Sequence, residues 1–109
     1  MDRVYDFTLT KVGEDLYSLD CNSLKMPDGS LKLLHNEVAV DFKVTEDGFQ
    51  ILSGWHIGTE DFDFEEGDSW DDYVEYYHPG ITEQVRSEMK RMEECGVDCN
   101  RKTNDGQSL

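Results

Sequence analysis

Apolar and polar residues alternate in four stretches of the first 57 residues, and this period of two restricts the possible folds more than any other feature of the chain. The clearest stretch is residues 37–45, in which one side of an extended chain is apolar: Val38, Val40, Phe42 and Val44. Residues 5–10, 17–21 and 49–57 show the same period. We therefore expect four β-strands, each with one side in a core and the other in water.

Turn-forming residues separate these strands. Residues 13–15 and 27–30 contain the Gly, Pro and Asp that tight turns prefer, and Asp47-Gly48 is a pair typical of a two-residue hairpin. The strands are therefore expected to follow one another as an antiparallel meander. The core face of the fourth strand is expected to hold Phe49, Ile51, Ser53, Trp55 and Ile57.

After the fourth strand, the spacing of apolar residues becomes helical. Ser69 and Asp72 form a capping-box-like start, and Pro79 cannot continue a helix, so a short helix is expected between them. Its apolar stripe would be Trp70, Tyr73, Val74 and Tyr77. A second helix is expected over about residues 81–95, with Gly96 as its natural end. Its stripe would be Ile81, Val85, Met89 and Met92.

These elements predict a single α+β domain over residues 1–99, in which an antiparallel meander sheet of four to five strands is packed by C-terminal helices. Residues 100–109 are polar and have no periodicity, so we expect them to be a disordered tail. A chain of this size can bury about 60–70% of its unfolded surface, which is enough for one core.

The sequence also carries signals about the compartment. Residues 1–6 lack the basic segment and apolar run of an export signal, and no stretch approaches the roughly 18 apolar residues of a membrane span. The three cysteines are an odd number, and Cys95 and Cys99 are too far apart for a C-x-x-C motif. We therefore expect a cytoplasmic protein in which these two thiols and that of Cys21 are free.

The negative charge is concentrated in the middle of the chain. The net charge is −15, and residues 44–85 hold twelve acidic residues and no Lys or Arg. Residues 1–43 hold eight acidic and five basic residues, and residues 86–109 hold five of each. A single central segment therefore accounts for most of the imbalance.

Within that segment, aromatic residues interleave with the acids. Six of the twelve aromatic residues lie in residues 62–77, and because disordered acidic segments are poor in aromatics, we expect the segment to be folded. In residues 61–65, two phenylalanines would face the core while three carboxylates face outward, about 6.6 Å apart along a strand. The candidate partner-binding acids are Glu60, Asp61, Asp63, Glu65, Glu66, Asp68, Asp71, Asp72 and Glu75. Trp70, Tyr73 and Tyr76 are the candidate apolar anchors among them.

In size, charge and aromatic interleaving, the chain resembles the acidic inhibitors that phages and mobile elements direct at host defence, including anti-restriction and anti-CRISPR DNA mimics. It also resembles the acidic immunity proteins that neutralise nuclease toxins. The resemblance covers no alignable motif. It implies a stoichiometric inhibitor that binds the basic cleft of a nucleic-acid-binding protein or nuclease. The alternative is a solvated acidic face that keeps the protein monomeric and soluble.

A weak calcium-binding module is a further alternative. Asp61, Asp63, Glu65, Gly67, Ser69 and Asp72 occupy positions 1, 3, 5, 7, 9 and 12 of an EF-hand-like loop. Glu66 stands at the sixth position, where the sharp turn needs glycine, and no helix is expected before the loop. The pattern therefore does not favour a specific site.

Catalysis and direct nucleic-acid binding are not expected. The sequence has no nucleophile motif, phosphate-binding loop or His/Cys ligand set, so no cofactor is expected either. His56 and His78 are expected at a boundary or on the surface. The basic residues Arg86, Lys90 and Arg91 share their helix with acidic residues. We therefore expect neither a nucleic acid nor a membrane as a direct partner.

Overall fold

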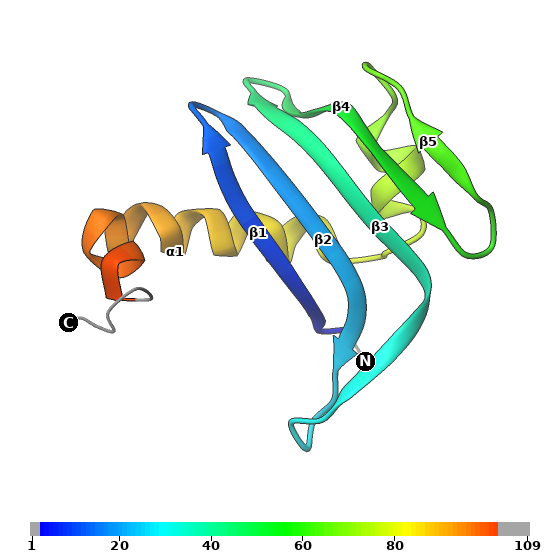
Figure 1. Ribbon diagram of the computed structural model, residues 1–109, viewed down its shortest axis with the longest axis horizontal. Helices are drawn as coiled ribbons and strands as arrows, with labels where there is room; N and C mark the ends of the chain where they lie inside the picture. The colour runs from blue at the N-terminus through cyan, green and yellow to red at the C-terminus, as the bar shows by residue number, and fades with distance from the viewer. Residues whose placement is uncertain (1–2, 103–109) are drawn as a thin grey trace.

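The computed structural model describes the backbone of residues 3–102 and the side chains of residues 3–94. Five antiparallel strands form one sheet in sequence order, which confirms the predicted meander (Figure 1). The strands are β1 (Tyr5–Gly13), β2 (Leu16–Lys25), β3 (Leu31–Thr45), β4 (Gly48–Ile57) and β5 (Phe62–Phe64). The short fifth strand is the one that carries the predicted alternation of phenylalanines and carboxylates.

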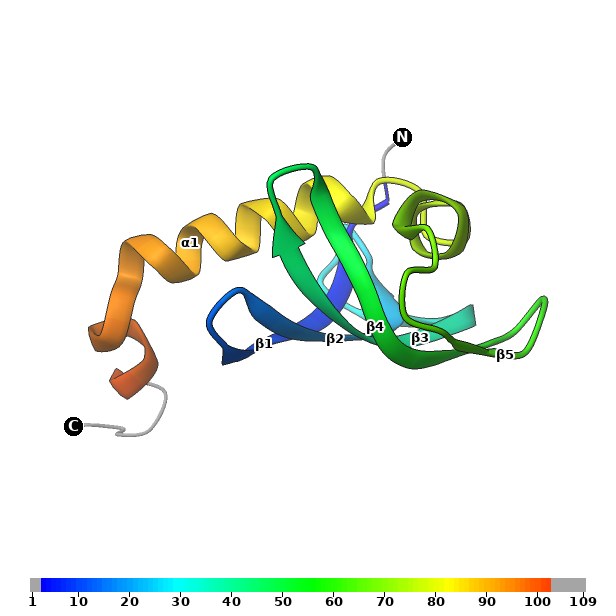
Figure 2. The same cartoon turned by 90° about the horizontal axis from the view of Figure 1, so that it is seen from above.

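One face of the sheet is covered and the other is open. The helix α1 (Ile81–Lys102) and the single π-helical turn η1 (Asp71–Glu75) lie on the same side of the sheet, as Figure 2 shows. This arrangement confirms the α+β class. None of the helices in the described part of the chain has the length and apolar character needed to cross a membrane.

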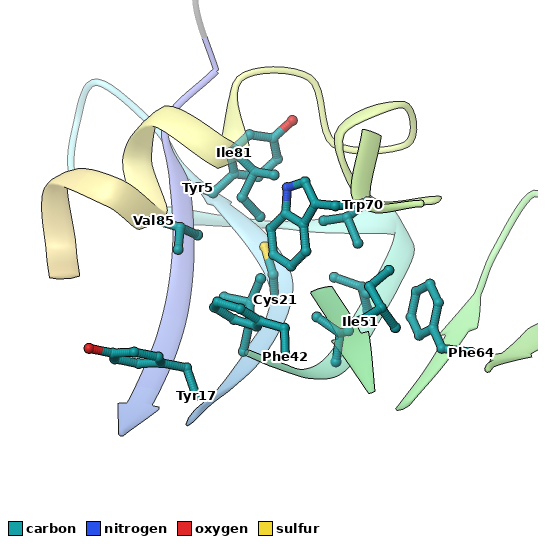
Figure 3. Packing of buried hydrophobic residues seen from close by; sticks show 13 residues of the cluster. Tyr5, Tyr17, Cys21, Phe42, Ile51, Phe64, Trp70, Ile81 and Val85 are labelled. Atoms are coloured by element: carbon teal, nitrogen blue, oxygen red, sulfur yellow. The ribbon is translucent and has the colours of Figure 1, made fainter. Parts of the chain in front are cut away.

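The core lies between the sheet and the helical layer. Its thirteen buried apolar side chains come from all five strands, from η1 and its N-terminal flank, and from the first turns of α1 (Figure 3). Trp70 is central to it, because its ring lies edge-on to both Phe42 and Phe49, with 4.8 Å between ring centroids in each pair. Its indole Nε1–H donates a hydrogen bond of 2.8 Å to Oγ1 of Thr82 on α1, so the polar part of the indole is also satisfied.

The predicted core face of β4 is correct only in its first half. Opposite β3, Phe42 pairs with Ile51 while Asp41 pairs with Ser53, so Leu52 is an extra residue in β4. Such a β-bulge moves every following side chain to the other face. The prediction that Trp55 and Ile57 are core residues is therefore wrong. Both are exposed, and His56 occupies the core side instead.

The expectation that the two histidines lie at a boundary or on the surface is also wrong. His56 and His78 are both fully buried. The bulge turns His56 inward, where its ring stacks on Phe62 at 4.9 Å. His78 follows η1, and Nε2 of its ring lies 3.0 Å from the carbonyl oxygen of Asn36.

The two helical segments begin where the sequence predicts but differ in extent. The backbone N–H of Asp72 donates to Oγ of Ser69 at 3.2 Å, as the capping pattern indicates, but η1 is only five residues long. Gly80 takes a positive φ of 89° just before α1 begins, which only glycine adopts without strain. Helix α1 then continues through Gly96 to Lys102, so the predicted end at Gly96 is wrong.

A helix can include an interior glycine at a cost of only about 1 kcal/mol, which explains why Gly96 is not a stop. Residues 100–102 of the expected tail are therefore helical. Residues 103–109 lie outside the described residues, so the tail remains a prediction there. The predicted apolar stripe of α1 is confirmed, with Ile81 and Val85 fully buried and Met89 and Met92 packed against the core.

Candidate functional site

The acidic segment, residues 60–75, is folded along one edge of the sheet. It runs from the β4–β5 turn through β5 and ends in η1. Within it, Phe62 and Phe64 pack against the core, while the side chains of Asp61, Asp63 and Glu65 are exposed. The three carboxylates that were predicted to face outward are therefore exposed.

Several of these carboxylates hold the segment in place. Asp61 Oδ1 accepts a hydrogen bond of 3.0 Å from the backbone N–H of Gly58 in the β4–β5 turn. Asp68 Oδ2 accepts one of 2.8 Å from the backbone N–H of Glu65. These bonds satisfy turn N–H groups that would otherwise need water. Asp61 and Asp68 therefore have a structural role that accounts for their presence.

Glu60 also has a structural role, like Asp61 and Asp68. Its carboxylate accepts a hydrogen bond from the hydroxyl of Tyr77, which follows η1. This bond raises the pKa of Tyr77 to about 12, because the neighbouring negative charge favours the protonated phenol. The contact joins the β4–β5 turn to the end of η1.

Glu75 has the most hydrogen-bond partners of the nine candidate acidic residues. Its two carboxylate oxygens accept hydrogen bonds from the backbone N–H groups of Gly80 (2.7 Å) and Thr82 (3.2 Å), and from the Thr82 hydroxyl (2.6 Å). Partial burial alone would raise the pKa of Glu75, but these three bonds outweigh it and lower the pKa. Glu75 therefore caps the start of α1 with a carboxylate, where a helix favours negative charge.

The remaining five carboxylates have no such role. Their side chains are exposed and accept no hydrogen bond from any residue that the structure describes. The five residues are Asp63, Glu65, Glu66, Asp71 and Asp72. They also form no ion pair, since the salt bridge found among the described side chains joins Glu88 to Arg91 on α1 at 2.6 Å. These five, called here the unpaired acids, are thus available to an external cation.

One polar hollow lies beside the unpaired acids. It has a volume of about 350 Å³ and is lined in part by Asp47, Asp68, Asp71 and Arg86. The guanidinium of Arg86 lies over the ring of Phe49, 5.3 Å from its centroid. The hollow therefore has charges of both signs and a cation already engaged with an aromatic ring.

The three predicted aromatic anchors differ in their accessibility. Tyr76 is 71% exposed and Tyr73 is 37% exposed, so both can contact a partner. Trp70 is only 6% exposed, because its ring packs at the centre of the core. The prediction that Trp70 is a surface anchor is therefore wrong. The helical spacing had also placed Trp70 on an apolar stripe, and the buried ring agrees with that prediction.

The residues of the EF-hand-like pattern do not converge. Asp63 lies on strand β5, whereas Asp61 and Glu65 lie in the segments on either side of it. Among the described residues, no three His, Cys, Asp or Glu side chains are placed to share a metal ion. The element before the pattern is strand β4, not a helix.

The pairing of the strands places one acidic residue that the sequence did not point to, Asp20, in the same cross-strand row as Asp63. Asp63 of β5 is opposite Trp55 of β4, and Trp55 is opposite Ala39 of β3. Ala39 is in turn opposite Asp20 of β2. The alternation had placed residues 37–45 correctly, but the neighbours of Ala39 across the sheet depend on the register of pairing.

No protein-family model matches this chain, and neither does any curated protein or solved structure. What defines it is its architecture: a five-stranded antiparallel meander, covered on one face by η1 and α1, with an acidic segment at one edge.

Proposed function

We propose that this protein is a stoichiometric inhibitor that binds the basic, nucleic-acid-binding site of another protein. The observation that carries the proposal is the set of unpaired acids, which are exposed on β5, the following turn and η1 and form no ion pair with a Lys or Arg of residues 3–94. Residues 44–85 contain no Lys or Arg at all. A basic partner would supply the missing cations.

The energetics support an external partner. Among the unpaired acids, Asp63 and Glu65 are two positions apart, which is about 6.6 Å in an extended chain, and two carboxylates at this separation repel each other by roughly 0.6 kcal/mol in water. This repulsion destabilises the free protein and is relieved when Lys or Arg side chains bind. The same side chains bind phosphates in nucleic-acid-binding proteins, so a fixed row of carboxylates can compete for them.

Two of the three histidines are buried in the core instead of lying at an accessible site. His56 and His78 are fully buried, so neither can reach a substrate as a general base. Tyr73 and Tyr76, by contrast, are exposed beside the acids and can provide apolar contacts to a partner surface.

The test starts with the partner captured from the source cell and eluted in a salt gradient, and compares two triple variants with equal loss of charge. In the first, Asp63→Asn, Glu65→Gln and Glu66→Gln remove unpaired acids without breaking a hydrogen bond. In the control, Glu14, Glu93 and Glu94, which are exposed and distant in sequence from the acidic segment, become Gln.

The first variant is expected to weaken binding by about tenfold or more and to reduce its salt dependence, whereas the control changes affinity little. Nucleic acid bound by the partner is expected to compete with the wild-type protein. Equal losses in both variants would show that only the overall charge matters. A partner that binds nucleic acid and this protein at the same time would contradict the inhibitor proposal.

A further inference from the structure

The face of the sheet opposite α1 and η1 is not covered by a helix (Figure 2). It carries exposed apolar side chains. Trp55 is 40% exposed and Ile57 is 48% exposed, and the bulge in β4 turns both to this face. Together with Asp61 and Asp63, they line an open hollow between β4 and β5. A tryptophan on an uncovered sheet face is costly in water unless something binds there.

The neighbours of Trp55 leave its ring accessible. On β3 its opposite residue is Ala39, whose methyl group is too small to cover an indole. On β5 its opposite residue is Asp63, which is exposed. Residues opposite each other in antiparallel strands have Cβ atoms about 4.5–5.5 Å apart, so the Asp63 carboxylate lies beside the indole. An aromatic face and a carboxylate therefore share one site.

Further carboxylates lie on this face of the sheet. Asp20 is opposite Ala39, Glu37 is opposite Ile57, and Asp41 accepts a hydrogen bond of 3.4 Å from Ser53. Lys43 is the basic residue that the same side of β3 presents. The face thus combines four carboxylates, from β2, β3 and β5, with an exposed tryptophan.

We propose that this face, centred on Trp55, is a docking surface for an arginine-rich segment of a protein partner. The proposal rests on the proposed function, because both require a basic partner, but it names a different surface and the side chain that is recognised. A guanidinium can stack on the indole while its N–H groups bind Asp63, since it is planar and donates bidentate hydrogen bonds. The ammonium of lysine has neither property.

Charge disfavours the other occupants. A second copy of the chain would place the carboxylates of Asp20, Glu37, Asp41 and Asp63 against the same four. A nucleic acid would bring phosphates to an acidic face. A neutral apolar segment would bury these carboxylates without pairing them, which costs free energy. A basic segment satisfies both the ring and the carboxylates.

The test uses the full chain and two synthetic probes of equal charge, a hexa-arginine and a hexa-lysine peptide. The indole Nε1–H signals of Trp55 and Trp70 are followed by nuclear magnetic resonance, with Trp55→Phe to assign them. The arginine peptide is expected to shift the Trp55 signal and leave that of buried Trp70 unchanged. It is also expected to bind about threefold or more tightly than the lysine peptide.

Two substitutions then locate the binding. Trp55→Ala is expected to weaken binding of the arginine peptide about fivefold, because it removes the cation–π contact. Asp20→Asn, which leaves the acidic segment intact, is expected to weaken it as well. The far-ultraviolet circular dichroism of each variant confirms that it is folded, which is expected since both side chains are exposed.

The outcomes separate this inference from the proposed function. Trp55→Ala could leave the affinity for the arginine peptide unchanged while the variant that lacks the Asp63, Glu65 and Glu66 carboxylates no longer binds it. The proposed docking surface would then be wrong, and the acidic segment would remain the proposed binding site. If Trp55→Ala and Asp20→Asn weaken binding while a double variant with Glu65→Gln and Glu66→Gln, which keeps Asp63, does not, the inference stands and these two unpaired acids do not bind the peptide. An arginine peptide that does not bind at low salt overturns the inference, and the captured partner still tests the function.

Discussion

The rings of His56 and His78 lie edge to face in the core, with 6.2 Å between their centroids. Nδ1 of His56 lies 2.6 Å from the carbonyl oxygen of Glu60, and Nε2 of His78 lies 3.0 Å from that of Asn36. Each ring therefore donates one N–H to the backbone when it is neutral. The remaining nitrogen of each ring is buried and has no hydrogen-bond partner among the described residues.

Acid is expected to destabilise the fold through His78. Burial lowers the pKa of His78 below its ordinary value of 6.5, against the opposing effect of the hydrogen bond to Asn36, and the nearby His56 and Arg3 add to the lowering. Below about pH 6.5 the unfolded chain therefore binds a proton that the folded chain resists, so the free energy of unfolding falls as the pH decreases. Urea unfolding at about pH 7.5, 6.5 and 5.5 measures this loss.

Two variants assign the effect to His78. His78→Gln removes the titrating group and is expected to flatten the change in urea midpoint between about pH 7.5 and 5.5, even if the variant is less stable throughout. His35→Gln removes an exposed histidine and is expected to keep the wild-type profile. A wild-type midpoint that stays constant over this range would show that the buried ring of His78 does not resist protonation.

The thiol of Cys21 is expected to be unreactive in the folded protein. Cys21 is only 3% exposed, and burial raises its pKa to about 11. At neutral pH the fraction of thiolate, the reactive form, is well below about one in a thousand. In a variant with Cys95→Ser and Cys99→Ser, alkylation of Cys21 by iodoacetamide is expected to accelerate with urea in parallel with unfolding. Rapid stoichiometric alkylation without urea would contradict this.

The order and pairing of the strands could be predicted because both depend on local signals. Alternation from Val38 to Val44 defines a strand by itself, and Asp47-Gly48 links it to the next one without reference to the rest of the chain. The start of α1 could be predicted from an equally local signal, since Pro79 and Gly80 end one helical segment and allow another to begin. Each of these features lies within a few residues.

The predictions that were wrong concern features that depend on contacts between distant residues. The apolar period of residues 49–57 continues unbroken in the sequence, but the backbone shifts by one residue at Leu52 to keep its pairing with β3. This shift exposes Trp55 and buries His56. One signal could have revealed it: Gly54, a glycine inside a strand, is typical of a bulge or of close backbone approach.

Gly54→Ala is expected to destabilise the protein by about 2–4 kcal/mol, measured by urea unfolding. Gly54 has a φ of 137°, and a Cβ added to it would lie 2.1 Å from the carbonyl oxygen of Ala39. The matched control is Gly29→Ala, since Gly29 also has a positive φ of 91° but has open space around it. The control is expected to cost only about 1–2 kcal/mol. Equal costs for the two would show that the close approach to β3 is absent.

Composition alone could not divide the carboxylates of the acidic segment into structural and unpaired groups. Glu66 and Glu75 are the same residue type in the same charged surroundings, and only the fold distinguishes them. Glu75 reaches the start of α1 because η1 ends one turn before it, whereas Glu66 lies in the exposed turn after β5. The Thr82 hydroxyl extends this contact inward, as it donates to Glu75 and accepts from Nε1 of Trp70.

Glu75→Ala is therefore expected to lower the free energy of unfolding by about 1–2 kcal/mol, as the loss of a helix cap does. Glu66→Ala, the matched control, is expected to change it by less than about 0.5 kcal/mol. Since the pKa of Glu75 is lowered in the folded state, the difference between the two variants should persist above its ordinary pKa of 4.5 and shrink as the pH falls below it. Urea unfolding at about pH 7 and pH 3.5 measures both differences. Equal stability of the two variants at neutral pH would mean that Glu75 does not cap α1, and that its charge belongs with the unpaired acids.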